Sequence, residues 1–519
     1  MAAEVPKLRR TLPWVFLAAV LLYLPTVRFG YVQDDRAIVV ANPAAHGVGA
    51  ALRALDQPYW PLPSEAGLYR PVSVLSFAID WSISGGRPGW LHLANALWHA
   101  LACILVVLVL ARWLPPWPAA IAGLVFAVHP AHVEGVANIV SRNELLATAG
   151  MFGAVLAARR RWWAAALTCV GLAMLSKEHA VVGGAVILVD DWMRPPGERR
   201  YPLWFYGLLG ALTAAYAGVW LRFGHAATAD VAAPFLGSGL GTRLAMALPA
   251  TLRAAQLLVF PLSLSADYSP QVIPFRTAIS LAAILGAGVV LVVFAGGIAV
   301  RRRAPALCFA ALATALAYLP TSNFVFPAGI ILAERNLYLA VLVPATVVGV
   351  GVTWALERWG RPRILLPLAL VLGALAARTL FRLPAWRDNR AFLLTLLEDH
   401  PESYRGQQSA AAVLSGMGLT SEARAAYARA DSLFDADPHL QAAYAYYLIG
   451  LGDTSQSATL VRDARRRLPR ERVAMRVEYL LARARREPER AAALSDTAQR
   501  WFPFERGWYA ASASPTRSP

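Results

Sequence analysis

Long apolar runs constrain this chain more than any other feature of its sequence. Charged residues make up only 16% of it, against about 25% in soluble domains. Eleven runs approach the length of about 20 residues that a helix needs to cross a bilayer. Because a bilayer offers backbone polar groups no partner, such crossing segments form helices. The sequence therefore predicts an all-α, polytopic membrane protein, with spans at residues 12–30, 91–112, 117–132, 143–158, 162–176, 180–194, 202–222, 277–300, 305–321, 338–357 and 363–381.

Basic residues collect in short loops between these runs. The net charge is +17, which on a soluble protein would suggest a nucleic-acid partner. Here the clusters fit the positive-inside rule and anionic lipid better, so no nucleic acid is expected. They predict a cytoplasmic N-terminus followed by an uncleaved first span. The cytoplasmic clusters are at residues 7–10, 112, 159–161, 194–200, 301–303 and 357–363.

Alternation from that N-terminus assigns the other loops to the outer side. This arrangement requires that the run 243–262 does not cross the membrane. Arg243, Pro249 and Arg253 interrupt that run, so we expect an interfacial or re-entrant helix there. The outer segments are then 31–90, 129–143, 177–179, 223–276, 322–337 and everything after 382.

An internal repeat with a 34-residue period follows the last predicted span. Ala423, Ser457 and Ala491 recur at this offset, as do Pro469 and Pro503. Small residues at such a period are typical of the tetratricopeptide repeat, a pair of closely packed helices, and about three repeats are present. We therefore predict a membrane domain at 1–385, an α-solenoid at 386–510 and a disordered tail at 511–519.

Two adjacent carboxylates, Asp34 and Asp35, lie a few residues beyond the first apolar run. Ionisable groups at the edge of a bilayer are costly and are functional-site candidates by default. The pair is therefore our candidate for the catalytic centre. The alternative is a helix cap or a solvated loop pair, and which aspartate would act as a base is open at this point.

Further polar residues gather in the predicted outer loops. Arg335, Lys177 and Arg142 are candidates for binding a phosphate group, whose charge a guanidinium or ammonium group stabilises. The alternative is that they form ion pairs between neighbouring helix ends. The candidates for substrate contact are Arg70, His92, His129, His132, Glu134, Glu144, Glu178, Asp267, Tyr268, Glu334 and Tyr338.

A His-x-x-His-x-Glu pattern at 129–134 offers three side chains of the kinds that bind metal ions. On a helical turn Glu134 would point away from the two histidines, so a divalent metal is not favoured. The three cysteines, Cys103, Cys169 and Cys308, lie within apolar runs and have neither disulfide nor zinc spacing. No particular cofactor is indicated, and a divalent metal stays a possible but not a favoured one.

Six motifs follow one another along the chain: Tyr31-Val32-Gln33-Asp34-Asp35, Tyr69-Arg70-Pro71-Val72, residues 91–99, residues 129–144, Ser176-Lys177-Glu178 and residues 333–338. With these motifs in this order, and with repeats behind them, the chain resembles the transmembrane and tetratricopeptide-repeat-containing O-mannosyltransferases and their bacterial relatives. Those proteins resemble members of the GT-C superfamily of integral-membrane glycosyltransferases. The resemblance covers most of residues 10–385 and the repeats.

The resemblance implies a polyprenyl-phosphate-linked sugar donor and an active site on the non-cytoplasmic face. It also implies an acidic base in the first outer loop, which maps onto Asp34 or Asp35. The Ala- and Arg-rich composition points to a bacterium with high GC content, hence to the inner membrane, with the repeats in the periplasm. Undecaprenyl phosphate would then replace dolichol phosphate.

We accordingly expect an inverting glycosyltransferase that moves a sugar, with mannose as a candidate, to a protein Ser or Thr hydroxyl. Two alternatives stay open: a similar transferase acting on a lipid or polysaccharide, and a non-enzymatic envelope assembly factor. The expected partners are the lipid-linked sugar, an acceptor protein or glycan, membrane lipids and a protein bound by the repeats.

Overall fold

The computed structural model describes residues 5–61, 68–223, 231–274 and 276–502, and this part contains helices but no β-strand. The all-α prediction is therefore confirmed. Every predicted span coincides with a helix or a short series of helices. The principal ones are α1 (Val5–Tyr23), α4 (Pro88–Leu110), α5 (Pro116–Val128), α7 (Arg142–Arg159), α8 (Trp163–Met174), α9 (Gly183–Trp192), α10 (Leu203–Phe223), α12 (Leu281–Leu291), α13 (Gly297–Ala299), α14 (Pro305–Tyr318), α15 (Leu342–Trp359) and α16 (Arg361–Arg382).

Six helices in the described part are long and apolar enough to cross a membrane by themselves, at α1, α4, α10, α12–α13, α15 and α16. A seventh arises if α5 and the segment Pro130–Ala137, which meet at a bend of 53°, form one span. α8 and α14 are apolar but shorter, and α9 is shorter still. Length and composition alone thus support a multi-pass membrane protein with fewer spans than the eleven predicted, because the remaining helices are short or carry charged residues.

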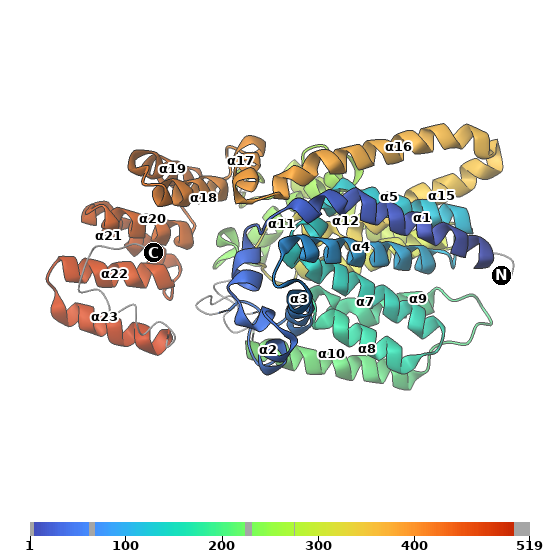
Figure 1. Cartoon of the computed structure of the whole chain (residues 1–519), viewed down its shortest axis with the longest axis horizontal. Coiled ribbons are helices and arrows are strands. Elements are labelled where there is room, and N and C mark those ends of the chain that lie inside the picture. Colours follow the sequence, from blue (N-terminus) through green and yellow to red (C-terminus); the bar gives the residue numbers. More distant parts are fainter. Residues whose placement is uncertain (1–4, 62–67, 224–230, 275, 503–519) are drawn as a thin grey trace.

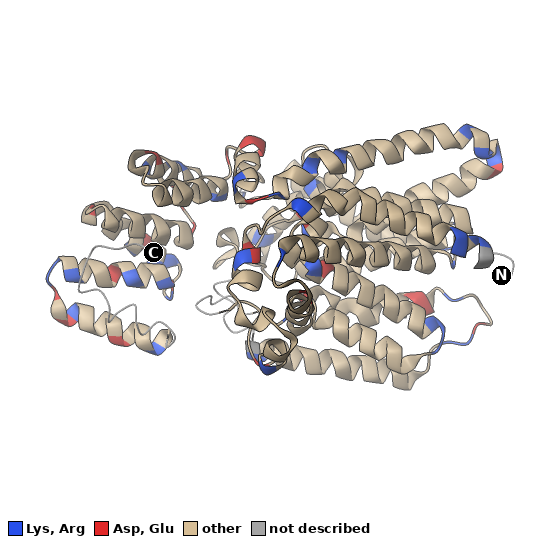
Figure 2. Cartoon of the chain, in the orientation of Figure 1, with Lys and Arg blue, Asp and Glu red and all other residues tan. Residues whose placement is uncertain are grey.

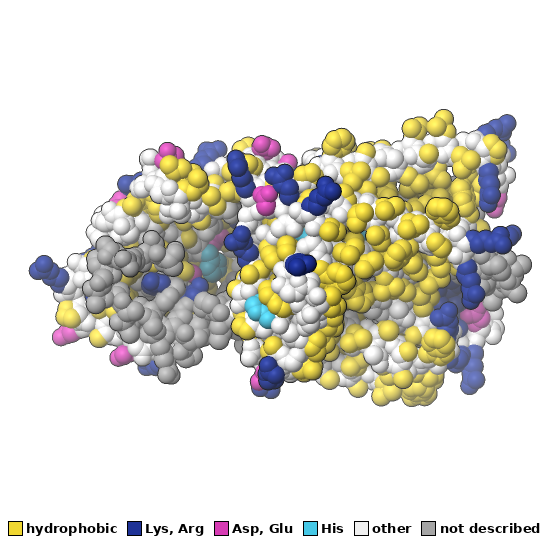
Figure 3. Space-filling view, viewed as in Figure 1, with side chains coloured by type: hydrophobic (Ala, Val, Ile, Leu, Met, Phe, Trp, Pro, Cys, Tyr) yellow, Lys and Arg dark blue, Asp and Glu magenta, His cyan; other side chains and the backbone are white. Residues whose placement is uncertain are grey.

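Close helix packing builds the bundle. α1, α4 and α5 run side by side, and α7 lies against α4 and α8 (Figure 1). At Gly150 of α7, a Cβ atom would stand 2.9 Å from the carbonyl oxygen of Cys169 in α8, so only glycine permits this approach. Small residues at such contacts are usual where helices pack in a membrane. Hydrophobic side chains cover much of the face of the bundle that is seen in Figure 3.

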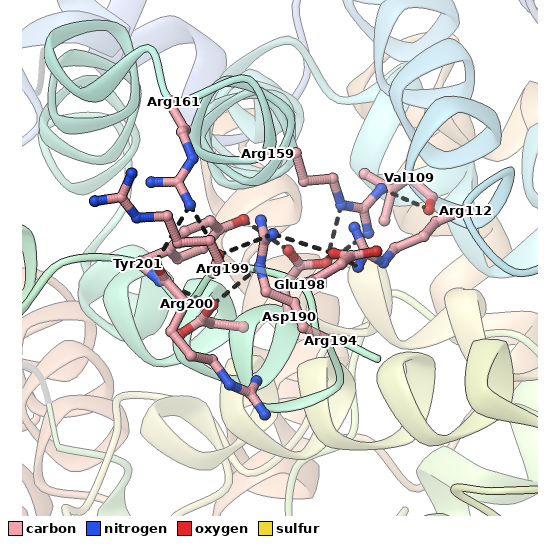
Figure 4. A network of polar contacts seen from close by, with 11 residues as sticks. Val109, Arg112, Arg159, Arg161, Asp190, Arg194, Glu198, Arg199, Arg200 and Tyr201 are labelled. Atoms are coloured by element: carbon pink, nitrogen blue, oxygen red, sulfur yellow. Dashed lines mark hydrogen bonds and ion pairs between the residues drawn. The ribbon is translucent and has the colours of Figure 1, made fainter. Parts of the chain in front are cut away.

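The basic loops predicted on the cytoplasmic side meet at one end of the bundle, together with the N-terminus (Figure 2). Arg112 pairs with Glu198 at 2.8 Å and Arg159 pairs with Asp190 at 2.6 Å. Arg161 donates to the carbonyl oxygen of Arg199 at 2.8 Å, so three loops are joined in one network (Figure 4). The predicted sidedness is therefore present in the structure, while the membrane orientation stays a prediction.

At the opposite end lie the first loop with its helices α2 (Val48–Arg53) and α3 (Pro71–Ser84), the short helix α6 (Val133–Ala137), and α11 (Leu240–Val259). α11 covers the run predicted not to cross, contains Pro249, and packs against α12. It is not among the helices that meet the length and hydropathy requirements for a span. Its place relative to the bilayer stays a prediction.

The repeats form paired antiparallel helices beyond this end of the bundle (Figure 1). α19, α21 and α23 begin at Thr420, Thr454 and Pro488, which repeats the period of 34 residues. Their buried faces carry small residues at the same offset, and the solenoid prediction is confirmed. The described helices are α17 (Asn389–Asp399), α18 (Tyr404–Gly416), α19 (Thr420–Leu433), α20 (Pro438–Gly450), α21 (Thr454–Arg467), α22 (Arg472–Ala484) and α23 (Pro488–Trp501).

The turns inside the repeats use glycine where the backbone needs a left-handed conformation. Gly418 has φ +77° and Gly452, one period later, has φ +84°. The other side of each repeat is capped by side chains, such as Asp437, whose carboxylate accepts from the amide of His439 at 2.8 Å. The domain boundary at 385/386 stays a prediction, and the tail predicted at 511–519 lies outside the described residues.

Candidate active site

A cavity of about 220 Å³ opens between the loop end of the bundle and the first helices of the solenoid. Its polar lining includes Asp34, Glu134 and Arg335 from three loops that are far apart in the sequence. Asp267 and Tyr268 line it as well. The cavity thus collects five residues that the sequence singled out, and it contains both a carboxylate and a guanidinium group.

Asp35 does not line this cavity, because its side chain turns into the protein. It is fully buried, and its two carboxylate oxygens accept from the amides of Val32 at 2.9 Å and Val140 at 3.0 Å. Burial raises the pKa of Asp35 to about 7, although both amides favour the charged form. Asp35 therefore fastens the loop that follows α1 to the turn Ile139–Ser141, which leads into α7.

Asp34 faces the cavity and is partly exposed. Gln33 just before it has φ +51°, and this left-handed residue sets the backbone direction from which the two aspartates diverge. Within the described part of the chain Asp34 has no hydrogen bond or ion pair. Burial raises its pKa; Arg335 and Arg70 oppose the rise, and the charge of Glu134 adds to it. Asp34 thus combines access to the cavity with raised basicity.

Arg335 lines the same cavity as Asp34. It belongs to the short helix Glu334–Leu337. Its guanidinium pairs with Glu134, and its amide donates to the other oxygen of that carboxylate at 2.9 Å. Glu134 is buried, whereas the Arg335 side chain is 29% exposed. Since a guanidinium has five N–H donors, the exposed part retains donors that can bind an anion in the cavity.

Lys177 and Arg142 do not line the cavity, although the sequence suggested a phosphate role for both. Arg142 is completely buried, pairs with Asp80 at 2.5 Å, and donates to Asn95 at 2.7 Å. Lys177 pairs with Glu144 and donates to the side chain of Asn336 at 3.1 Å. The observed contacts of Arg142 are those of the ion-pair alternative, and its phosphate role stays a prediction.

The remaining charged candidates brace neighbouring loops. Arg70 holds Glu178 with contacts of 2.8 and 2.9 Å, and it lines a second cavity. Glu334 is buried and accepts from the hydroxyl of Tyr268 at 2.7 Å. Burial raises the pKa of Glu334 to about 7. These contacts keep the cavity walls in place without presenting the carboxylates of Glu178 and Glu334 to it.

The histidines bind backbone and side-chain oxygens next to the cavity. The Nε2 atoms of His92, His129 and His132 lie 3.2, 3.1 and 2.9 Å from the carbonyl oxygens of Gly30, Leu258 and Tyr338. The hydroxyl of Tyr338 meets His99 at 2.7 Å. In the ranges that the structure describes, no three His, Cys, Asp or Glu side chains are grouped to hold a metal ion. The histidine–glutamate pattern is thus not assembled as a ligand set.

One wall of this cavity could not be predicted from the sequence. This wall comes from the end of the last span and the start of the solenoid, and its residues are Trp386, Phe392, Tyr404 and Arg405. Asn138 lines the cavity as well. The repeat pattern predicts which residues pack between helices, but not which face the bundle. Only Arg405, a charged residue in the first turn of α18, carries a local signal, and many surface arginines share it.

No protein-family model matches the chain. Among curated proteins, protein O-mannosyl-transferase Tmtc1 of Drosophila melanogaster is 34% identical over 194 residues, covering 35% of this chain and 23% of that protein. Human TMTC3 is 31% identical over 166 residues, covering 29% and 18%. The Caenorhabditis elegans protein O-mannosyl-transferase F38B6.6 is 27% identical over 335 residues, covering 62% and 48%. The chain thus matches less than half of the length of each of these relatives.

Among solved structures, the crystal structure of ArnT from Cupriavidus metallidurans bound to undecaprenyl phosphate has 15% identity and a TM-score of 0.36, over 97% of this chain and 87% of that one. The APC/C hetero-tetramer Cut9–Hcn1 has 13% identity and a TM-score of 0.28, over 85% and 92%. Both TM-scores are too low to establish a common fold. In sequence the chain is similar to these protein O-mannosyl-transferases, which confirms the resemblance drawn from its ordered motifs.

Proposed function

We propose that this protein is a membrane glycosyltransferase that moves a sugar from a polyprenyl-phosphate carrier to a hydroxyl group. The observation that carries the proposal is that Asp34 and Arg335 line the same cavity at the end of the bundle. One is a carboxylate with no partner in the described part, and the other is a guanidinium with exposed donors. Its relatives' names supply the reaction class and mannose as the first candidate sugar.

The chemistry needs one base and one cation. The acceptor hydroxyl oxygen attacks the anomeric carbon, the bond from that carbon to the phosphate oxygen breaks, and its electron pair stays on the phosphate. Asp34 takes the hydroxyl proton as the new bond forms, and its raised pKa makes it a stronger base than an ordinary aspartate. Arg335 stabilises the charge that develops on the leaving phosphate. A single displacement inverts the anomeric centre.

We place this site on the non-cytoplasmic side of a bacterial inner membrane, with the solenoid in the periplasm and a protein Ser or Thr as acceptor. The basic network at the other end of the bundle supports this orientation, since basic loops favour the cytoplasm. The solenoid beside the cavity supports a polypeptide acceptor. A lipid or polysaccharide acceptor is the alternative outcome of the test below.

Replacing Asp34 by Asn tests the proposal, because the amide keeps the shape of the side chain and removes the base. The purified full chain in lipid nanodiscs would be given undecaprenyl-phosphate-linked mannose, glucose or galactose with threonine peptides, a lipid acceptor or a glycan. We expect transfer to a peptide, and its loss by about 10²–10⁴-fold in the variant. Asp56→Asn is the matched control, since Asp56 is an exposed carboxylate of the same loop.

Normal turnover by Asp34→Asn would refute the role of this residue. Transfer to the lipid or glycan alone would replace the polypeptide acceptor. No transfer by the unaltered protein with any pairing of donor and acceptor would count against the glycosyltransferase proposal as a whole.

A further inference from the structure

The start of the solenoid is fixed to the loop that carries Asp34. The amide of Gly30 donates to the carbonyl oxygen of Arg387 at 2.8 Å, and the amide of Gln33 donates to the side chain of Asn389 at 2.7 Å. On the far side of the cavity, the hydroxyl of Ser403 donates to Asp267 at 2.8 Å. These hydrogen bonds fix the position of the solenoid wall relative to the loop that carries Asp34 and to the segment that carries Asp267.

Arg405 is the solenoid's cation in this cavity. Its Nε donates to the hydroxyl of Tyr404 at 3.2 Å, and that hydroxyl donates to Asp437 at 2.7 Å. Within the described residues its two terminal nitrogens have no hydrogen-bond or ion-pair partner. The chain thus orients this guanidinium through one nitrogen and leaves the other two for a ligand.

The two cations of the cavity occupy different surroundings. Arg335 acts on Asp34 electrostatically and is paired with Glu134. The carboxylates nearest to Arg405 are Asp267 and Asp437, and both already accept hydrogen bonds from other groups. Arg335 therefore suits the leaving phosphate, whereas Arg405 belongs to the solenoid side of the cavity.

The shape of the wall next to Arg405 indicates what kind of acceptor fits. Phe392, Leu396 and Leu332 contribute apolar surface to the lining of the cavity that Arg405 also lines. The volume of about 220 Å³ is below the roughly 300–1,000 Å³ of common ligand pockets. A small cavity whose lining is partly apolar, with an arginine whose terminal nitrogens have no partner in the described residues, fits a short extended segment of polypeptide better than a folded surface.

We propose that Arg405 and the apolar wall beside it form an acceptor subsite, which binds an acidic side chain of an extended polypeptide near the hydroxyl that Asp34 deprotonates. This inference rests on the proposed glycosyl transfer. It assigns the solenoid a part in the active site, because its helix α18 supplies a residue that selects the acceptor. A guanidinium–carboxylate contact is charge-assisted and directional, which suits this kind of selection.

Paired peptides test this subsite. Each pair has one threonine and differs only by Glu or Gln at a neighbouring position, and kcat/KM is measured with the full chain in nanodiscs. We expect the unaltered protein to prefer the Glu peptide about tenfold, as for a hydrogen bond between charged groups. Arg405→Gln should bring the ratio near one, Arg405→Glu should favour a Lys peptide, and Arg405→Lys should keep the preference for Glu.

Arg429→Gln is the matched control, because Arg429 is exposed on α19 and does not line the cavity; it should keep the preference. Equal rates for both peptides with the unaltered protein, or an undiminished preference in Arg405→Gln, would overturn the subsite. If no sugar is transferred at all, the proposed reaction fails instead. In that case, fluorescence anisotropy of labelled Glu and Gln peptides measures their affinities for the same variants. The ratio of the two affinities then tests the role of Arg405 as the ratio of kcat/KM values would have done.

Discussion

Asp34 and Asp35 should respond in opposite ways to replacement by alanine. Asp35 is fully buried, and alanine in its place leaves the amides of Val32 and Val140 without partners. An unsatisfied buried donor costs about 1–3 kcal/mol, so losing both acceptors costs about 2–6 kcal/mol. Part of this is offset, because burial already disfavours the charged carboxylate and raises its pKa to about 7. We expect Asp35→Ala to lower the free energy of unfolding by an amount at the lower end of this range, about 2–3 kcal/mol.

Asp34 has no such contacts, so Asp34→Ala should leave stability unchanged and lower transfer by about 10²–10⁴-fold. Thermal unfolding followed by tryptophan fluorescence, in one detergent and at one scan rate, compares the variants. A loss of 1 kcal/mol lowers the Tm of a 150–250-residue domain by about 2–4 °C. The Tm of Asp35→Ala should therefore fall by several degrees.

The reverse pattern would refute this division of roles. If Asp34→Ala lowered the Tm while Asp35→Ala kept it and abolished transfer, Asp35 would be the base and Asp34 the structural residue. Equal destabilisation by both changes would show that the loop depends on the pair as a unit.

Four further outcomes are expected. Arg335→Gln should weaken binding of the lipid-linked donor by roughly ten- to a hundredfold in a titration, with little change for peptide; equal effects on both would contradict a phosphate role. Because burial raises the pKa of Asp34 and the base must be ionised, kcat/KM should fall as pH drops through a value above the ordinary aspartate range; an acid limb below about pH 4 would contradict this. Arg142→Gln should leave Asp80 unpaired and lower the Tm, while folded protein keeps its donor affinity; weaker donor binding without destabilisation would restore the phosphate role. Chelation with EDTA should leave transfer unchanged, and rescue by added Mg²⁺ or Mn²⁺ would reveal a metal requirement.

Local chemistry made much of the architecture predictable. Apolar length placed each helix of the bundle, and the spacing of Ala423, Ser457 and Ala491 gave the period of the solenoid. Charge alternation separated a basic end from the end that carries Asp34. These signals depend on neighbours within one helix, one loop or one repeat, so a single sequence contains them.

The membership of the cavity could not be predicted in the same way. The sequence drew attention to the Asp34–Asp35 pair, but the left-handed backbone at Gln33 and the amides of Val32 and Val140 decided that only Asp34 faces the cavity. Arg142 and Arg335 look alike as arginines near helix ends, and only packing encloses one and exposes the other.

The sequence by itself determined the helices, the repeat period and the two unlike ends of the bundle, and it singled out one acidic loop as the candidate catalytic centre. The tertiary structure alone decided which carboxylate is accessible, which cations remain available, and that Arg405 stands in the wall of the same cavity. The physical reason is range: hydropathy and periodicity act between near neighbours, whereas burial, ion pairing and cavity walls arise where segments far apart in the chain meet.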